Sequence, residues 1–192
     1  MDNKYLKHEI MCRVKPIISS WDVSDIYAIS LWVNDNCDNP CEPTVTLGYN
    51  TESQCHEASK RASSKEEARW NYAFWLQNDE LIFGGDETKD IVRDWIVSNG
   101  MPYIPCINYD WDWPDDVPLS LLRRITDEFV NTLVDIVTEL HETGFIQNKF
   151  GKSIPLIIHE LEYYHKIAQQ NKKANPNDAI AAFVNWIEGL YH

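Results

Sequence analysis

The chain has 192 residues, which is close to the size of one ordinary domain. Its 30 acidic and 17 basic residues give a formal net charge of −13. A charge of this sign repels nucleic-acid phosphates and anionic membrane surfaces, so binding to either is disfavoured. A basic protein partner would instead be attracted, although acidity can also serve solubility alone.

The sequence favours a cytoplasmic protein. The N-terminal residues, Met1 to Tyr5, lead into a mixed segment without the apolar core of a signal peptide. No apolar stretch is long enough to span a bilayer. The number of cysteines is odd, at five, and in the absence of a secretion signal we expect them to be reduced thiols.

The first third of the chain predicts a helix followed by two paired strands. Apolar residues at four-residue spacing predict a helix over 4–15, and Pro16 is expected to end it. Residues 26–33 are apolar and rich in β-branched and aromatic types, which predicts a strand. A turn-rich loop separates them from an alternating strand over 44–49, so we expect antiparallel pairing.

In the middle of the chain, Ser63 and Glu66 have the spacing of a capping box. They predict a helix that continues to Leu76 and whose aromatic residues are buried in the core. Residues 81–83 could form a third strand, and residues 86–98 predict another helix.

The last third predicts three more helices. The first spans about 119–142 and has a broad apolar face. The second starts near Pro155 and runs through Lys172, and the third begins at 175–178. The apolar stripe of the third is expected to consist of Ala182, Trp186 and Leu190.

This order of elements predicts an α+β fold with a small antiparallel sheet packed against several helices, and a mostly helical C-terminal half. We expect one domain over residues 1–192, with a proline-rich, acidic and tryptophan-containing loop at about 101–118.

One group of residues has zinc-ligand chemistry. Cys37, Cys41, Cys55 and His56 supply four soft ligands in a short span. Only one pair has close spacing, so loop thiols without a metal are the favoured interpretation.

Catalytic motifs are weak. His159 and His165 are six residues apart, whereas two zinc ligands on one helical face need a spacing of four. We therefore interpret His159 as a partly buried core residue or a cap partner. Neither a Gly-x-Ser-x-Gly motif nor a glycine-rich phosphate loop occurs, and a Cys/His hydrolase remains an open alternative.

Acidic residues concentrate between positions 86 and 116. This segment contains eight acidic and two basic residues, so its local charge is −6. Alternating Asp and Trp residues suit protein recognition, because Trp anchors interfaces and Asp pairs with Arg or Lys. The alternatives are inward-packed Trp residues with solvated Asp residues, or a metal or catalytic site. The predicted contact loop comprises Asp110, Trp111, Asp112, Trp113, Asp115 and Asp116, and the predicted supporting surface comprises Asp86, Glu87, Asp90 and Asp94.

Three stretches, 26–33, 46–52 and 62–76, resemble a bacterial family classified as a domain of unknown function. Members of that family resemble immunity proteins of polymorphic or contact-dependent toxin systems. The resemblance covers about the first half of the chain. It implies a small, acidic, cytosolic protein that neutralises a cognate toxin without catalysis, and no cofactor is expected.

The sequence therefore predicts an immunity protein that binds a toxin domain, expected to be basic, tightly and non-covalently through an acidic, Trp-containing surface. Two alternatives stay open, namely a small metal-dependent or Cys/His hydrolase and a non-enzymatic scaffold module.

Overall fold

The computed structural model describes residues 2–22, 24–105 and 117–191. The described elements, in chain order, are α1 (Asn3–Ser20), β1 (Ile26–Asp35), η1 (Asn36–Asp38), β2 (Pro43–Thr51), α2 (Glu52–Ala58), α3 (Lys65–Trp70), η2 (Tyr72–Phe74), β3 (Leu81–Phe83), α4 (Lys89–Ser98), α5 (Leu119–Glu142), α6 (Phe145–Phe150), β4 (Leu156–His159), α7 (His165–Ala174) and α8 (Asn177–Gly189). The α+β class is confirmed, and the C-terminal half is mostly helical.

The described strands form one sheet in the order β3-β2-β1-β4. The predicted hairpin is confirmed, because β1 and β2 pair antiparallel with Leu31 opposite Leu47. The predicted strand at 81–83 is also confirmed, as β3 pairs antiparallel with β2. The fourth strand, β4, runs parallel to β1, so the sheet is mixed rather than wholly antiparallel.

Both faces of the sheet are buried against helices. Successive residues of a strand point to opposite faces, and Ile29, Leu31 and Val33 of β1 belong to a core that includes residues of α1, α4 and α5. Tyr27 and Ala28 belong to a second core with residues of α3, η2, α7 and α8. The two cores explain why β1 is apolar along nearly its whole length.

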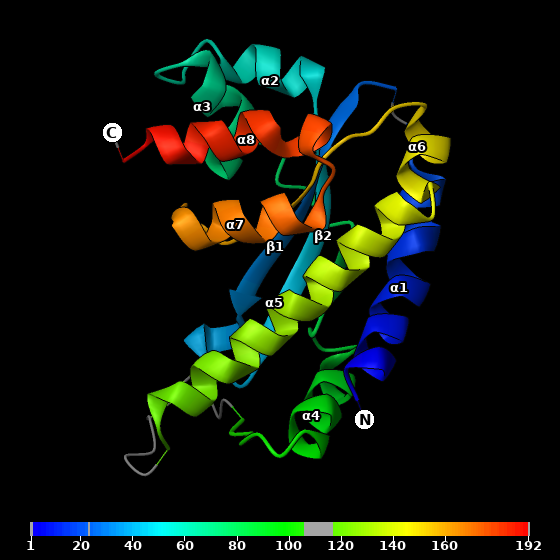
Figure 1. The fold of residues 1–192 in the computed structure, drawn as a ribbon, viewed down its shortest axis with the longest axis vertical. Helices are drawn as coiled ribbons and strands as arrows, with labels where there is room; N and C mark the ends of the chain where they lie inside the picture. The colour runs from blue at the N-terminus through cyan, green and yellow to red at the C-terminus, as the bar shows by residue number, and fades with distance from the viewer. Residues whose placement is uncertain (1, 23, 106–116, 192) are drawn as a thin grey trace.

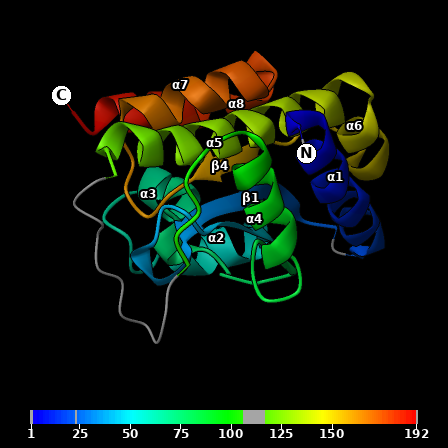
Figure 2. The same cartoon turned by 90° about the horizontal axis from the view of Figure 1, so that it is seen from below.

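Figure 1 shows α5 running diagonally along the molecule beside α1, with α7 and α8 forming a helical hairpin. Seen from below in Figure 2, α5 and the α7–α8 hairpin lie side by side above the strands. The predicted bounds of α5 are confirmed, and this helix buries one continuous apolar face.

Two predicted helix ends were wrong. Pro16 lies inside α1, which continues to Ser20. Proline removes one backbone hydrogen bond, but Ile18 extends the buried stripe of the helix past it. The helix predicted from Ser63 to Leu76 instead ends at Trp70, where the Asn71 side chain accepts a hydrogen bond from the Ala73 N–H and starts η2.

The capping box is displaced by one residue from its predicted position. The Ser64 side chain accepts from the Glu67 N–H at 3.0 Å, and the Glu67 carboxylate accepts from the Ser63 N–H at 2.7 Å. Helix α4 likewise begins at Lys89, three residues after the predicted start at Asp86.

Two predictions for the last third of the chain were also wrong. Residues 156–159 form β4 rather than a helix, and α7 begins only at His165. In α8 the buried stripe is Ile180, Phe183, Val184 and Ile187, whereas Ala182 and Leu190 are exposed. That stripe faces the aromatic residues of the second core, including Trp70.

Candidate functional site

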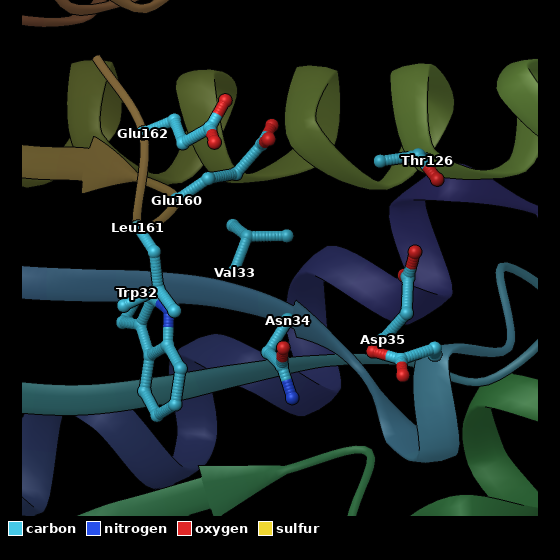
Figure 3. A pocket seen from close by; sticks show the side chains of 9 residues that line it. Trp32, Val33, Asn34, Asp35, Thr126, Glu160, Leu161 and Glu162 are labelled. Carbon is cyan, nitrogen blue, oxygen red and sulfur yellow. The ribbon is translucent and has the colours of Figure 1, made fainter.

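Parallel pairing of β1 and β4 brings two acidic segments together where both strands end. Trp32 pairs with His159, so the residues that follow each of them meet at one edge of the sheet. They enclose a hollow of about 320 Å³ (Figure 3). It is lined by Trp32, Val33, Asn34, Asp35, Asp38, Thr126, Glu160, Leu161 and Glu162.

A second hollow, of about 640 Å³, adjoins the first and shares Trp32 and Asn34 with it. Its floor is a cross-strand row in which Trp32 pairs with Thr46 and Thr46 pairs with Ile82. Ile82 is an exposed hydrophobic residue. The acidic residues of the second hollow are Asp79, Glu80, Asp86 and Glu87.

We call these two hollows together the acidic groove. Eight carboxylates line it, and neither lysine nor arginine is among the described residues of its walls. A third hollow, which also includes Asp35, is lined by two basic residues, Arg123 and Lys166. The acidic groove therefore combines a floor that includes two large apolar side chains, Trp32 and Ile82, with walls of a single charge.

Gly48 allows the segment that carries Asp79 and Glu80, one acidic wall of the groove, to approach β2 closely. A Cβ atom at this position would lie 2.4 Å from the backbone oxygen of Asn78, so only glycine lets that segment approach β2. The Asn78 side chain accepts a hydrogen bond from the Tyr49 N–H at 3.0 Å. These contacts fix Asp79 and Glu80 beside the floor.

The surroundings of Asp35 in the groove disfavour the charged form of its carboxyl group. Burial is the main cause that raises the pKa of its carboxyl group, and together with the nearby carboxylates of Glu160 and Asp38 it brings this pKa to about 6. Its Oδ1 atom is buried and accepts no hydrogen bond from the described residues. A buried acceptor left in this state costs about 1–3 kcal/mol.

Trp32 is half-buried, and its indole N–H is likewise buried without an acceptor among the described residues. Its ring lies 5.7 Å from that of Tyr72, and the Tyr72 ring lies 4.7 Å from the imidazole of His159. These ring contacts restrict the orientation of Trp32 in the floor. An aromatic side chain of restricted orientation is typical of an interface anchor.

His159 orients the end of β4 and has no access to solvent. Its Nε2 atom lies 2.8 Å from Ser30 Oγ, and its Nδ1 atom lies 2.9 Å from the Glu160 carbonyl oxygen. Burial lowers the pKa of this imidazole to about 4, so it is neutral at pH 7. Since both side chains are at most 2% exposed, this serine–histidine pair is sealed from any substrate. The interpretation of His159 as a core residue is confirmed.

The candidate zinc ligands are split between the two ends of β2. Cys37 and Cys41 precede this strand, and Cys55 and His56 follow it in α2. Nine extended residues span roughly 30 Å. Cys41 is buried in the first core and Cys55 packs against the second. In the part of the chain that the structure describes, no three His, Cys, Asp or Glu side chains form a group that could hold a metal ion.

The structure divides the predicted contact residues into three groups. Asp86 and Glu87 line the acidic groove. Asp90 and Asp94 lie on α4, where Arg93 pairs with them at 2.5 Å and 2.8 Å. The remaining six, Asp110, Trp111, Asp112, Trp113, Asp115 and Asp116, lie outside the described residues.

Sequence reasoning missed most of the groove. Its other members are Trp32, Asp35, Asp38, Asp79, Glu80, Glu160 and Glu162. The pairing of β1 with β4 brings Trp32, Asp35 and Asp38 to Glu160 and Glu162, which are more than 120 residues away in the chain, and no local pattern signals it. One usable signal was the polar end of β1, where Asp35 follows an otherwise apolar strand.

Among the described helices, none is both long enough and apolar enough to cross a membrane. Comparison of the chain with protein-family models, curated proteins and solved structures finds no significant match.

Proposed function

We propose that this protein is a cytoplasmic immunity protein that neutralises a cognate bacterial toxin by tight, non-covalent binding, and that the acidic groove is part of its binding surface. The observation that carries the proposal is the single-signed groove, in which eight carboxylates surround a floor containing Trp32. Such a surface attracts a basic partner and accelerates its association.

The chemistry of the groove favours arginine as the partner's anchoring side chain. A guanidinium group can stack on the exposed face of an indole and donate two hydrogen bonds to one carboxylate. Trp32 and Asp35 supply these two elements in the same hollow.

Two exposed apolar residues of the groove, Leu161 and Ile82, are consistent with this mode of binding. Leu161 is 67% exposed and lines the same hollow as Trp32, while Ile82 is 48% exposed at the far end of the floor. The apolar stem of an arginine or a neighbouring apolar residue can cover them. The carboxylates then surround an apolar centre, as the polar rim of a protein interface does.

The test is co-purification followed by kinetics. The tagged protein is expressed with the product of the gene directly upstream, and we expect stoichiometric recovery of a complex whose affinity falls as salt rises. Failure to recover this product, when it is well expressed, would count against the proposal.

Charge reversal then tests the groove itself. Glu162→Lys and Glu87→Lys each change an exposed side chain of the groove, and each should lower the association rate constant by about fivefold or more. Glu188→Lys, an equal charge change on exposed α8, is the matched control and should alter the rate by less than about twofold. Equal effects of all three variants would show that net charge, rather than the groove, governs binding.

A further inference from the structure

A basic hollow lies on the surface between α1 and α5, away from the acidic groove. Its volume is about 480 Å³. It is lined by Lys4, Lys7, His8, Met11, Cys12, Lys15, Pro16 and Glu139. Three lysines against one glutamate give it a local charge of +2, in a chain whose net charge is −13.

The single carboxylate of this hollow is already engaged. Glu139 pairs with Lys7 at 2.9 Å and with Lys15 at 3.9 Å. Lys4 is exposed and forms no ion pair with any described residue. The hollow therefore keeps positive charge available for an anionic ligand.

A thiol and an imidazole meet in this hollow. Cys12 and His8 are four residues apart on α1 and so share one helical face. Cys12 Sγ lies 3.4 Å from His8 Nε2. Cys12 is exposed, whereas Cys41 is buried and Cys55 is half-buried. An imidazole within hydrogen-bonding reach of a thiol can act as the base that takes up the thiol proton when the sulfur attacks.

We propose that Cys12 is a redox modification site that forms a mixed disulfide with a small, carboxylate-bearing thiol compound of the glutathione class. His8 accepts the Cys12 proton, and Sγ attacks one sulfur of the corresponding low-molecular-weight disulfide. The disulfide bond of that compound breaks and a new one forms to Cys12. The other half leaves as a thiolate and takes up the proton. The disulfide is the oxidant, so atoms and electrons balance.

The hollow suits a ligand of this class in size as well as in charge. Small-molecule sites commonly have volumes of about 300–1,000 Å³, and this one has about 480 Å³. Lys4 and Lys15 can pair with the carboxylates of the ligand while its sulfur reaches Cys12. The proposal does not depend on toxin binding.

The test uses the full-length protein and two probes, glutathione disulfide and the uncharged 2-hydroxyethyl disulfide. Peptide mass spectrometry follows all five cysteines over time. With glutathione disulfide, Cys12 should be modified at least about tenfold faster than Cys55. Equal rates at the two cysteines would overturn the proposal.

Variants separate the charge of the hollow from simple exposure of the thiol. Lys4→Gln with Lys15→Gln should slow the reaction of Cys12 with glutathione disulfide by about fivefold and leave the reaction with the uncharged disulfide nearly unchanged. His8→Gln should slow both reactions. If the lysine variant slows both probes equally, or neither, the hollow has no role in selecting an anionic ligand. Far-ultraviolet circular dichroism checks that each variant is folded.

Discussion

The side chain of Asn171 takes the place of a neighbouring strand beside Ile158. Its Oδ1 atom accepts from the Ile158 N–H at 2.8 Å, and its Nδ2 atom donates to the Ile158 carbonyl at 2.7 Å. Asn175 does the same for Leu156, at 2.8 Å and 2.9 Å. These contacts close the outer edge of β4, because each amide satisfies both backbone groups of one strand residue.

The match between α7 and β4 is geometric. Four residues of an α-helix rise about 6 Å, and two residues of a strand rise about 6.6 Å. Two asparagines four apart on α7 can therefore reach alternate residues of β4. The α7–β4 contact thus continues the hydrogen-bonding pattern of the sheet with side chains instead of a fifth strand.

Replacing Asn171 should strongly destabilise the protein. Asn171→Ala leaves the Ile158 N–H unpaired in the core and removes one of the two side-chain donors to the Ile158 carbonyl, the other being Gln170 at 3.0 Å. We therefore expect a loss of about 2–4 kcal/mol in the free energy of unfolding, measured with urea. Gln169→Ala on the same helix, at an exposed position, is the control and should change it by less than about 0.5 kcal/mol. A loss below about 1 kcal/mol for Asn171→Ala would contradict the proposed closure of the edge.

Asp35→Asn should stabilise the free protein and weaken its complex. Because the folded state raises the pKa of Asp35 from 3.8 to about 6, it holds this proton more tightly than the unfolded state. Stability attributable to Asp35 is therefore highest below pH 4 and is lost as the pH rises to about 6. The full penalty is at most about 3 kcal/mol, and we expect roughly 1–2 kcal/mol at pH 7 after solvent screening.

Urea unfolding at pH 4 and at pH 7 checks this prediction. Asp35→Asn should exceed the wild type in stability at pH 7, and the difference should shrink at pH 4. Glu188→Gln is the control, since Glu188 is exposed on α8 and is not among the groups that raise the pKa of Asp35. If the same Asp35→Asn protein binds the toxin as tightly as the wild type, Asp35 is not an anchor for the partner.

The reliable parts of the sequence-based prediction depended on local patterns. The strand beginning at Ile26 and the helix over 119–142 carry apolar residues at the period of their own secondary structure. Capping chemistry was also recognisable near Ser63, although the cap is one residue later. In these places the local preference and the tertiary environment agree.

The failures have tertiary causes. Leu156 and Ile158 pack into the first core, while Ile157 packs into the second, so β4 is buried on both faces. A strand of this kind has no alternating pattern and is easily confused with a buried helix. Its identity depends on pairing with β1. The groove was missed for the same reason, because Glu160 and Glu162 were assigned to a helix.

His159 should make the folded protein sensitive to mild acid. Burial lowers the pKa of its imidazole from 6.5 to about 4, so the folded state excludes a proton that the unfolded state accepts. Stability attributable to His159 is therefore present above about pH 6.5 and is lost as the pH falls towards 4. Asp35 has the opposite dependence over the same range, so the effect is best isolated in the Asp35→Asn background.

In that background, the free energy of unfolding should fall by roughly 2 kcal/mol between pH 7 and pH 5. The matched comparison is Asp35→Asn with His159→Gln, because glutamine does not titrate and can still accept a hydrogen bond from Ser30. The measured quantity is the slope of the free energy of unfolding against pH. A loss of packing that is the same at every pH does not change this slope and so does not affect the conclusion. An equal slope in the two proteins would contradict burial of a neutral His159.

Charge reversal at Asp112 and Asp115 should weaken toxin binding and slow association, as predicted for an acidic contact loop. Tyr103 donates a hydrogen bond to the buried Glu42 at 3.0 Å, and Leu119, at the start of α5, lines a hollow together with Asp35.

Stopped-flow association and equilibrium binding measure the effect of Asp112→Lys with Asp115→Lys, alone and combined with Glu162→Lys. Independent contacts should give free-energy changes that add within about 0.5 kcal/mol, whereas a shared partner residue should make the combined change smaller than the sum. If the doubly reversed protein keeps wild-type affinity and rate while Glu162→Lys does not, the assignment to Asp112 and Asp115 is wrong and the acidic groove alone attracts the toxin.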